Sequence, residues 1–335
     1  MRIWRENNIV VPKDKQLPYL NPVLAVPKGA NDVRFVINAI ELNKVLEDEV
    51  LQLERPEVIL QAMANRHWYI AMDISAFYLN FLVDEASSDL LAFRDPLSNR
   101  IWKFTRSIFG VKGSGSYSCR LLAEELEKIP EFNTFIFSYA DDLLISADTE
   151  DQLLRLFSSL LSVLDECKLL IKPKKTKIGY KSLDVFGYTV SVRGMQPSLS
   201  RIKSLVETPV PTSTKQLISH LSSLSYFRNN FPPQAPMAKF SALFSHFTKN
   251  NVPFRWTETD TVNWRLMHEA AGECILKNRI LDSDDHIIIR SDASELYYGW
   301  VVTAKRGDSE VIINTGSKLW TASSQPVRQS FHTVN

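Results

Sequence analysis

Cysteine is scarce in this sequence. Cys119, Cys167 and Cys274 are the three cysteines among 335 residues. An odd number of widely spaced cysteines argues against a disulfide framework and against a thiolate zinc site. The six histidines are scattered too, and none stands in HExxH or a similar ligand spacing. The sequence therefore disfavours disulfide-rich and zinc-dependent classes of protein.

Long apolar runs and a charge excess are also missing. No run approaches the roughly 20 apolar residues that cross a bilayer, and the N-terminal MRIWRENNIV lacks the apolar core of a signal peptide. We therefore expect a cytoplasmic protein without a membrane partner. The formal net charge of +1 neither supports nor excludes binding to nucleic acid, because basic residues can still cluster locally.

What is present is a succession of apolar segments separated by turns. The 335 residues, 44% hydrophobic and 23% charged, are typical of a globular protein with several domains. The patterns predict strands at 20–29, 33–42 and 67–83, a helix at 118–129, a strand–turn–strand at 132–147, a helix at 150–168, a hairpin turning at Arg193-Gly194, helices to about 275 and strands beyond.

The centre of the functional interpretation is Tyr139-Ala140-Asp141-Asp142, at the tip of the predicted hairpin. Two adjacent carboxylates between apolar strands are costly unless a cation neutralises them, and carboxylate oxygens suit Mg²⁺. A solvated polar turn is the alternative, because aspartate is common in turns.

Asp73 strengthens the cation hypothesis, because it also ends a predicted buried strand, in AMDISAFY. If the two strands are neighbours, three carboxylates converge and can hold two metal ions. One ion would lower the pKa of an attacking hydroxyl, and the other would stabilise a leaving pyrophosphate.

These segments, in this order, resemble the reverse transcriptases of retroviruses and LTR retrotransposons, most closely those of Gypsy-type Pol polyproteins. The resemblance covers nearly the whole chain. It implies that Asp73, Asp141 and Asp142 are the catalytic, metal-binding residues of a polymerase palm.

The same resemblance assigns nucleotide contacts. The family's fingers segment is similar to NPVLAVPKGANDVRFVINAIELNK in this sequence. This similarity implies that Lys28 and Arg34 bind the triphosphate. The alternative is that both are solvated surface charges. In DISAFY, Tyr78 matches the aromatic wall that rejects a ribose 2′-hydroxyl, although a shift of one residue would make Phe77 the candidate. Phe109 and Gly110 would lie under the nucleotide.

Two departures and one open assignment accompany the resemblance. Gly115 and Ser116 replace the family's Pro-Ala, and Asn38, Ala39 and Ile40 replace Asp, an aromatic residue and Arg, which predicts fingers less tightly tied to the palm. In IKPKKTKIGY, either Lys174 or Lys175 would approach the leaving pyrophosphate, unless the lysine run is a solvated face.

The C-terminal half resembles the family's remaining parts. VFGYTVS is similar to the segment that supports the primer's 3′ end, which implies a primer grip of Phe186, Gly187 and Tyr188. PTSTKQLISHLSSLSYFRNNFP resembles the helical thumb. RSDASELYYGWVV resembles the start of a ribonuclease H domain, with Asp292 as its first metal ligand. Since the later carboxylate positions are not matched, we expect a vestigial, truncated domain without hybrid-cleaving activity.

Together these observations predict an α+β right-hand polymerase with fingers, a ferredoxin-like palm and a helical thumb, followed by an incomplete α/β ribonuclease H-like domain. The predicted parts are 1–190 (fingers and palm), 191–275 (thumb and connecting helices) and 276–335.

The expected activity is RNA- and DNA-templated addition of dNTPs to a primer 3′-hydroxyl, with two Mg²⁺ ions that Mn²⁺ can replace. The expected partners are a primed RNA or DNA template and other parts of a Pol polyprotein, in the cytoplasm or a retroelement particle. One alternative is another class of polymerase or nuclease that uses the same metals; the bulky Tyr78 disfavours an RNA-dependent RNA polymerase. The other alternative is an inactive or domesticated retroelement fragment that only binds nucleic acid.

Overall fold

The computed structural model describes residues 2–27, 33–47, 53–248, 253–278 and 286–320. The chain packs as two compact units: the first comprises 1–56 and 69–180, and the second comprises 57–68 and 181–335. The predicted boundary at 190 therefore falls inside the second unit, and the one at 275 separates no units. The predicted thumb and the ribonuclease H-like segment share one packed body, together with a helix from before the palm.

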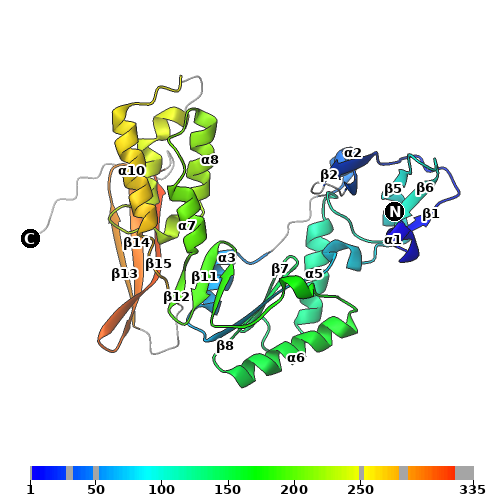
Figure 1. Ribbon diagram of the computed structural model, residues 1–335, viewed down its shortest axis with the longest axis horizontal. Helices are drawn as coiled ribbons and strands as arrows, with labels where there is room; N and C mark the ends of the chain where they lie inside the picture. Colours follow the sequence, from blue (N-terminus) through cyan, green and yellow to red (C-terminus); the bar gives the residue numbers. More distant parts are fainter. Residues whose placement is uncertain (1, 28–32, 48–52, 249–252, 279–285, 321–335) are drawn as a thin grey trace, which may run out of the picture. The chain divides into compact units, whose positions relative to one another are not determined.

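The first unit contains the predicted strand–turn–strand around Asp141 and the paired strands near the N-terminus (Figure 1). Its elements are α1 (Arg2–Glu6), β1 (Val10–Pro12), β2 (Val23–Pro27), β3 (Val33–Ile37), α2 (Ile40–Val45), β4 (Trp68–Asp73), η1 (Phe77–Asn80), α4 (Glu85–Leu90), β5 (Ala92–Arg94), β6 (Ile101–Phe104), α5 (Ser114–Leu126), β7 (Ile136–Tyr139), β8 (Asp142–Ala147), α6 (Glu150–Glu166), η2 (Pro173–Lys175) and β9 (Lys177–Tyr180).

Two predicted strands in this unit end earlier than expected. The strand that begins at Val33 stops at Ile37, because the Asn38 Oδ1 accepts a hydrogen bond from the Ile40 N–H and the chain turns into α2. The strand predicted for 67–83 stops at Asp73, and Ala76, with a φ of 49°, introduces the short 3₁₀ helix η1. The terminus of β4 therefore coincides with the aspartate.

A four-stranded sheet of order β7-β8-β4-β9 forms the centre of the first unit. β7 pairs antiparallel with β8, and β4 pairs antiparallel with β9. The strands are apolar, and Tyr69, Ile70, Leu143 and Ile145 are fully buried. Thr149 caps α6 by accepting from the Gln152 N–H, and α6 packs on β8. The sheet thus has a rigid, dry interior up to the ends of its strands.

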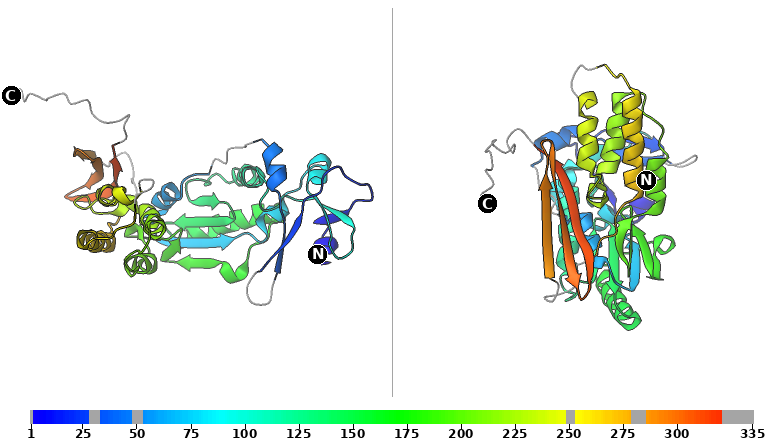
Figure 2. Two further views of the ribbon diagram at one scale, coloured as in Figure 1. Left: turned by 90° about the horizontal axis from the view of Figure 1, so that it is seen from above. Right: turned by 90° about the vertical axis from the view of Figure 1, so that its left-hand side faces the viewer.

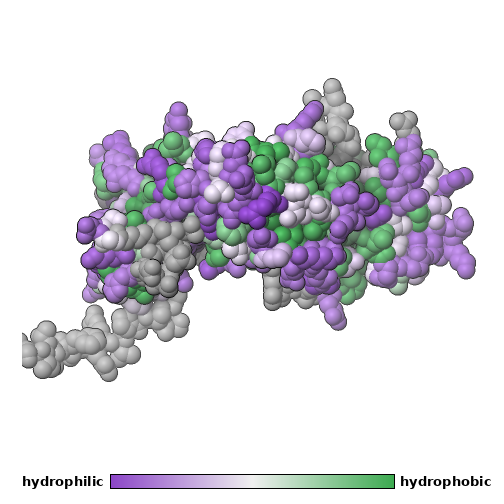
Figure 3. All heavy atoms as spheres, turned by 90° about the horizontal axis from the view of Figure 1, so that it is seen from below, coloured by the Kyte–Doolittle hydropathy of each residue, from purple (hydrophilic) through white to green (hydrophobic). Residues whose placement is uncertain are grey.

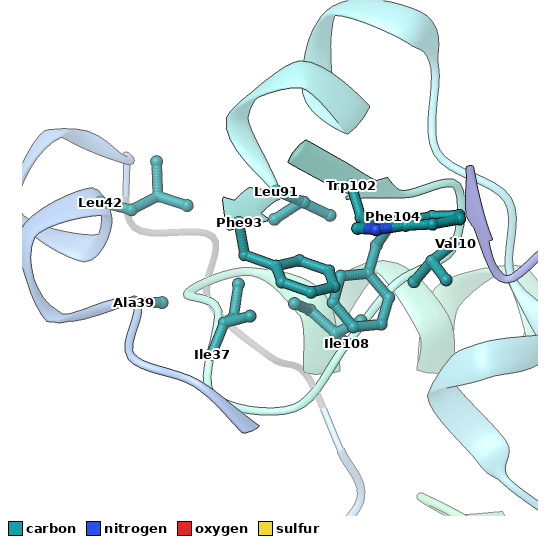
Figure 4. Close-up of a cluster of buried hydrophobic side chains, with 9 residues drawn as sticks. All are labelled: Val10, Ile37, Ala39, Leu42, Leu91, Phe93, Trp102, Phe104 and Ile108. Carbon is teal, nitrogen blue, oxygen red and sulfur yellow. The ribbon is translucent and has the colours of Figure 1, made fainter. Parts of the chain in front are cut away.

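A separate core supports the N-terminal part of this unit. β1, β6 and β5 form a sheet, and their side chains join residues after β3 in one apolar cluster (Figure 4). Ala39 belongs to this cluster and is 5% exposed. Ala39, which stands where the resembling family has an aromatic residue, is therefore a core residue.

The second unit combines a β-hairpin layer, helices and a C-terminal sheet. Its elements are α3 (Pro56–Met63), β10 (Ser182–Val185), β11 (Tyr188–Ser191), β12 (Gly194–Pro197), α7 (Leu199–Val206), α8 (Thr214–Ser225), η3 (Arg228–Asn230), α9 (Met237–Leu243), η4 (Ser245–Thr248), α10 (Glu258–Gly272), β13 (His286–Ala293), β14 (Tyr297–Arg306) and β15 (Ser309–Leu319). The hairpin predicted to turn at Arg193-Gly194 is confirmed one residue earlier, because Gly194 already pairs with Ser191.

The strands β13, β14 and β15 form an antiparallel sheet, as the alternating pattern predicted (Figure 2). Helical segments from upstream cover part of it: η3 and α9 both pack on β15. The Ala238 N–H donates to the Ser317 Oγ at 3.2 Å. β13 remains exposed, with Ile289 at 70%. Among the described residues, β15 is the strand of this sheet that packs most closely on the helical segments before it.

A buried ion pair ties α3 into the second unit. The Lys277 ammonium, which is fully buried, lies 2.6 Å from the Glu57 carboxylate. The Asn229 side-chain amide donates to the same carboxylate at 3.0 Å. Since an unpaired buried charge is strongly unfavourable, this network fixes residues from three distant parts of the sequence together.

The surface carries no candidate for a transmembrane helix. Among the described residues, no helix is both long and apolar enough to cross a bilayer. On the face shown in Figure 3, hydrophobic residues are interspersed with hydrophilic ones, which is ordinary for a folded protein.

Candidate active site

The three predicted aspartates are brought together by the central sheet of the first unit. Asp73 is the last residue of β4, and Asp142 is the first residue of β8, the strand beside it. Tyr139 pairs with Asp142, so Ala140 and Asp141 form the two-residue turn. The Ile74 N–H donates to the Asp141 carbonyl at 2.8 Å, which ties the end of β4 directly to that turn.

The turn itself has an uncommon backbone conformation. Ala140 has a φ of 52°, in the left-handed region, which costs an L-residue roughly 1–2 kcal/mol. Apolar pairing on both sides, including buried Phe137 and Leu143, holds the turn in this conformation. The strain is thus maintained at the point where two carboxylates are presented.

Asp73 is nearly buried, and both of its carboxylate oxygens have a cationic partner. The Lys172 ammonium contacts Oδ1, and the Lys175 ammonium lies 2.7 Å from Oδ2. Burial alone would raise the pKa of Asp73, but the hydrogen bonds from the two lysines outweigh it, so the pKa lies below its ordinary value. Asp73 is therefore ionised and paired.

Asp142 experiences the opposite balance. Burial, followed by the charges of Asp141 and Asp73, raises its pKa to about 6. The mutual repulsion shows that the three carboxylates lie within electrostatic reach of one another. Among the described residues, however, no group of three or more His, Cys, Asp or Glu side chains is already arranged around a metal position.

The donor chemistry nevertheless fits a hard divalent cation. Carboxylate oxygens are the ligands that Mg²⁺ prefers, and it completes its coordination with water and phosphate oxygens. The two ammonium groups at Asp73 stand where compensating positive charge is needed. Asp73, Asp141 and Asp142 are therefore the residues that would hold such ions.

An aromatic wall stands beside the turn, and it distinguishes Tyr78 from Phe77. The Phe77 ring is 3% exposed and belongs to the core. The Tyr78 ring is half-buried and packs edge-on against Phe109, with centroids 4.7 Å apart. Burial, with the neighbouring Cys119 and Asp141, raises the pKa of Tyr78, so its ring lies close to the carboxylates. Of the two candidates, Tyr78 lines the site.

The segment before α5 provides an exposed floor. Phe109 is 47% exposed, and Gly110, with a φ of 82°, leaves open space where a side chain would stand. The Asn43 amide donates to the Gly110 carbonyl at 2.8 Å and accepts from the Lys112 N–H at 2.8 Å. Asn43 follows the altered Asn38-Ala39-Ile40 stretch, so α2 is bonded to this floor despite the changed residues.

The predicted triphosphate contacts fall partly outside the described residues. Lys28 lies outside them. The Arg34 backbone belongs to β3, where it pairs with Val26, and its side chain is not described. The two predicted strands on either side pair antiparallel, as β2 and β3.

The predicted primer grip forms the β10–β11 turn of the second unit. Phe186 and Gly187 have φ values of 50° and 78°, and Tyr226 donates its hydroxyl to the Phe186 carbonyl at 2.9 Å. Tyr188 instead points into the core: it is 2% exposed and packs on Phe227. Phe186 and Gly187 form the tip, and Tyr188 supports it.

Asp292 lies on the exposed strand β13, paired with Gly299. Its carboxylate accepts from the Ala293 N–H at 2.8 Å. The described residues bring no acidic cluster to it.

Sequence reasoning missed Lys172 and Cys119 at the site. Lys172 belongs to the lysine-rich segment that was singled out, but the family resemblance pointed to Lys174 or Lys175. The η2 turn brings Lys172 and Lys175 to Asp73 together. Cys119 was considered only as a possible metal ligand or disulfide partner, and no sequence signal places it beside the turn.

Comparison with known proteins agrees with this geometry. The chain aligns with the solved structure of the foamy viral protease–reverse transcriptase dRH in complex with double-stranded DNA, with a TM-score of 0.83 and 17% identity, over 96% of this chain and 55% of that one. The fold is therefore an α+β polymerase fold.

Sequence comparison gives a family match. Residues 26–190 match the family model described as reverse transcriptase (RNA-dependent DNA polymerase). The chain is 24% identical over 326 residues to the retrovirus-related Pol polyprotein from transposon 412 of Drosophila melanogaster, covering 94% of this chain and 25% of the relative. It is 23% identical over 300 residues to the retrovirus-related Pol polyprotein from transposon 297 of Drosophila melanogaster, covering 87% of this chain and 27% of the relative.

Residues 26–190 thus match a reverse transcriptase domain, and the chain as a whole is similar to these retrotransposon polyproteins. It spans about a quarter of their length.

Proposed function

We propose that this chain is the polymerase part of a retrotransposon reverse transcriptase, which extends a primer 3′-hydroxyl with dNTPs on an RNA or DNA template. The observation that carries the proposal is the hydrogen bond from the Ile74 N–H to the Asp141 carbonyl, because it places Asp73, Asp141 and Asp142 at one strand end. The family match and the DNA-bound structural neighbour add support.

In this proposal the three aspartates hold two Mg²⁺ ions, or Mn²⁺ in their place. Bound ions would activate the attacking hydroxyl and stabilise the leaving pyrophosphate. The protein's contribution is to present preorganised carboxylates on a stiff sheet, so that little reorganisation is needed during the reaction.

The neighbouring side chains would position the nucleotide. Tyr78, braced by Phe109, would stand against the sugar and exclude a 2′-hydroxyl. Gly110 offers backbone and open space to the base. Lys28 and Arg34 would offset triphosphate charge from the hairpin, since cationic donors pair strongly with phosphate. Lys175, already beside Asp73, would be available to the pyrophosphate.

The test is primer extension by purified protein on primed RNA and primed DNA templates with Mg²⁺. Wild type is expected to extend both, and Asp141→Asn is expected to lose activity by at least roughly a hundredfold, because a ligand of the catalytic ions is gone. Asp165→Asn is the matched control, since this exposed aspartate lies on α6.

Equal, poor extension by wild type and Asp141→Asn would contradict the proposal. Binding of the same primed templates without extension would then favour the alternative of a fragment that only binds nucleic acid.

A further inference from the structure

Each carboxylate oxygen of Asp73 has a lysine partner. Lys172 contacts Oδ1, and Lys175 lies 2.7 Å from Oδ2. The Asp73 side chain is only 12% exposed, so little of the carboxylate is open to solvent. A metal ion that used Asp73 as a ligand would need an oxygen that a lysine now holds.

Lys172 is the more firmly placed of the two. Its side chain is 37% exposed against 63% for Lys175. Its ammonium also reaches the Ile74 carbonyl at 3.3 Å, and its backbone N–H donates to the Asp73 carbonyl at 2.8 Å. The backbone contact holds the residue beside β4, while the flexible stem leaves the ammonium free to move.

The charges explain why lysines occupy this place. Asp73, Asp141 and Asp142 are like charges brought to neighbouring strand ends, where the Ile74 N–H bonds to the Asp141 carbonyl, so they repel one another. Two ammonium groups reduce that repulsion in the absence of metal. Divalent ions bring more charge and stronger coordination to oxygen, so both kinds of cation cannot use the same lone pairs at once.

We propose that Lys172 is a displaceable counter-ion of Asp73, which stabilises the metal-free site and sets its affinity for divalent cations because an entering ion must replace it. The inference rests on the proposed function and assigns a role to a residue outside the predicted site. Metal binding is then an exchange of partners at Asp73, with Lys172 swinging toward solvent while its backbone stays bonded to β4.

The first test is Mn²⁺ titration of the full chain, without nucleic acid or nucleotide, at constant ionic strength, with free Mn²⁺ followed by electron paramagnetic resonance. Lys172→Met keeps the aliphatic stem and removes the charge. We expect it to bind Mn²⁺ roughly threefold to tenfold more tightly than wild type, as removal of a competing ion pair predicts. Lys174→Met is the matched control for loss of a nearby charge, and its affinity is expected to stay within about twofold of wild type.

The second test uses wild type alone, so that it does not depend on the folding of a variant. An amine-reactive reagent followed by mass spectrometry would measure labelling of Lys172 with and without saturating Mn²⁺. Labelling of Lys172 is expected to rise when Mn²⁺ is bound, while labelling of Lys174 stays constant.

The outcomes separate this inference from the proposed function. If Asp141→Asn binds as much Mn²⁺ as wild type does, or if neither binds any, the proposed function itself is contradicted. If that binding is present but Lys172→Met has wild-type affinity, or Lys172 labelling does not change, only the role assigned to Lys172 is overturned.

Discussion

At the scale of single residues, Tyr78 has the most specific role to test. Its ring is fixed between Phe77 and Phe109, at centroid distances of 5.3 and 4.7 Å. We expect Tyr78→Val to raise the ratio of ribonucleotide to deoxyribonucleotide incorporation by roughly tenfold or more, because the steric wall is gone. Tyr78→Phe keeps the ring and should keep the ratio.

The measurement is single-nucleotide incorporation with each dNTP and its ribonucleotide counterpart on one primed template. A ratio that Tyr78→Val leaves unchanged would place the sugar gate elsewhere. Phe77 is a poor second choice, since it is buried in the core and its loss would first destabilise the fold.

At the scale of elements, the β10–β11 turn depends on a residue that tolerates a left-handed backbone. Gly187 has a φ of 78°, and a Cβ there would lie 3.5 Å from the Phe227 ring, an ordinary contact. Gly187→Ala is therefore expected to lower the free energy of unfolding by about 1 kcal/mol through backbone strain alone.

Urea denaturation would measure that change. Gly272→Ala is the control, because this glycine ends α10 with open space around it, and alanine favours a helix by up to about 1 kcal/mol. Equal stability of Gly187→Ala and wild type would mean that the turn relaxes. If Gly187→Ala stays folded under the assay conditions but extends the primer more slowly than wild type, the primer-grip assignment is supported.

The helices of the second unit contain a pH-sensitive pair. The Nε2 atoms of His220 on α8 and His268 on α10 lie 2.9 Å apart, and both rings pack against Trp264 at tilted angles. Burial, with a contribution from His268, lowers the pKa of His220 to about 4, and burial lowers the pKa of His268 too. Both rings are therefore neutral in the folded protein at pH 7.

Stability should consequently fall in acid. The unfolded chain takes up protons near the ordinary histidine pKa of about 6.5, whereas folded His220 takes one up only near 4. The stabilisation is complete above about pH 6.5 and is lost as the pH falls toward 4.

Thermal unfolding between pH 7.5 and 5 would test this dependence. Each lost kcal/mol lowers the Tm by about 2–4 °C in a domain of 150–250 residues. His220→Gln should reduce the pH dependence of the Tm, and substitution of the exposed His67 should not. Parallel curves for wild type and His220→Gln would contradict the assignment.

At the scale of the whole molecule, the C-terminal sheet decides whether a second activity is present. Asp292 is exposed on β13, and the described residues bring no acidic cluster to it. We expect this chain not to cleave the RNA of an RNA–DNA hybrid, because one carboxylate cannot hold two metal ions in the geometry of an in-line attack.

A labelled hybrid incubated with the protein and Mn²⁺ would test this. Asp141→Asn would identify cleavage that depends on the polymerase site. Cleavage that persists in Asp141→Asn but disappears in Asp292→Asn would show that residues interpreted here as structural complete a second site.

Much of the local structure could be predicted from the sequence alone, because it is encoded over short distances. The apolar strands around Asp141 and Asp142, the helix predicted at 150–168 and the strands predicted after residue 275 all occur as expected. The convergence of Asp73 with the other two aspartates was also predictable, since both segments end buried strands and the family resemblance makes them neighbours.

The tertiary structure decided what depends on contacts between distant residues. The left-handed backbone of Ala76 starts the 3₁₀ helix η1 after β4. In that helix the Phe77 ring is buried, whereas Tyr78 is partly accessible. The η2 turn brings the Lys172 ammonium to the Asp73 carboxylate, although the two residues lie 99 positions apart in the sequence. The same ammonium also reaches the Ile74 carbonyl.

Contacts between distant residues also decide how the chain divides into its two units. Glu57, Asn229 and Lys277 share one buried network, so helix α3 packs with segments that follow it by more than a hundred residues. Sequence determined the strands, the helices and the choice of Asp73, Asp141 and Asp142 as candidate site residues, because periodicity and motif are local properties. Which charges pair, which aromatic ring faces the site and which segments share a core were decided by packing, because burial makes each of those choices depend on every neighbour.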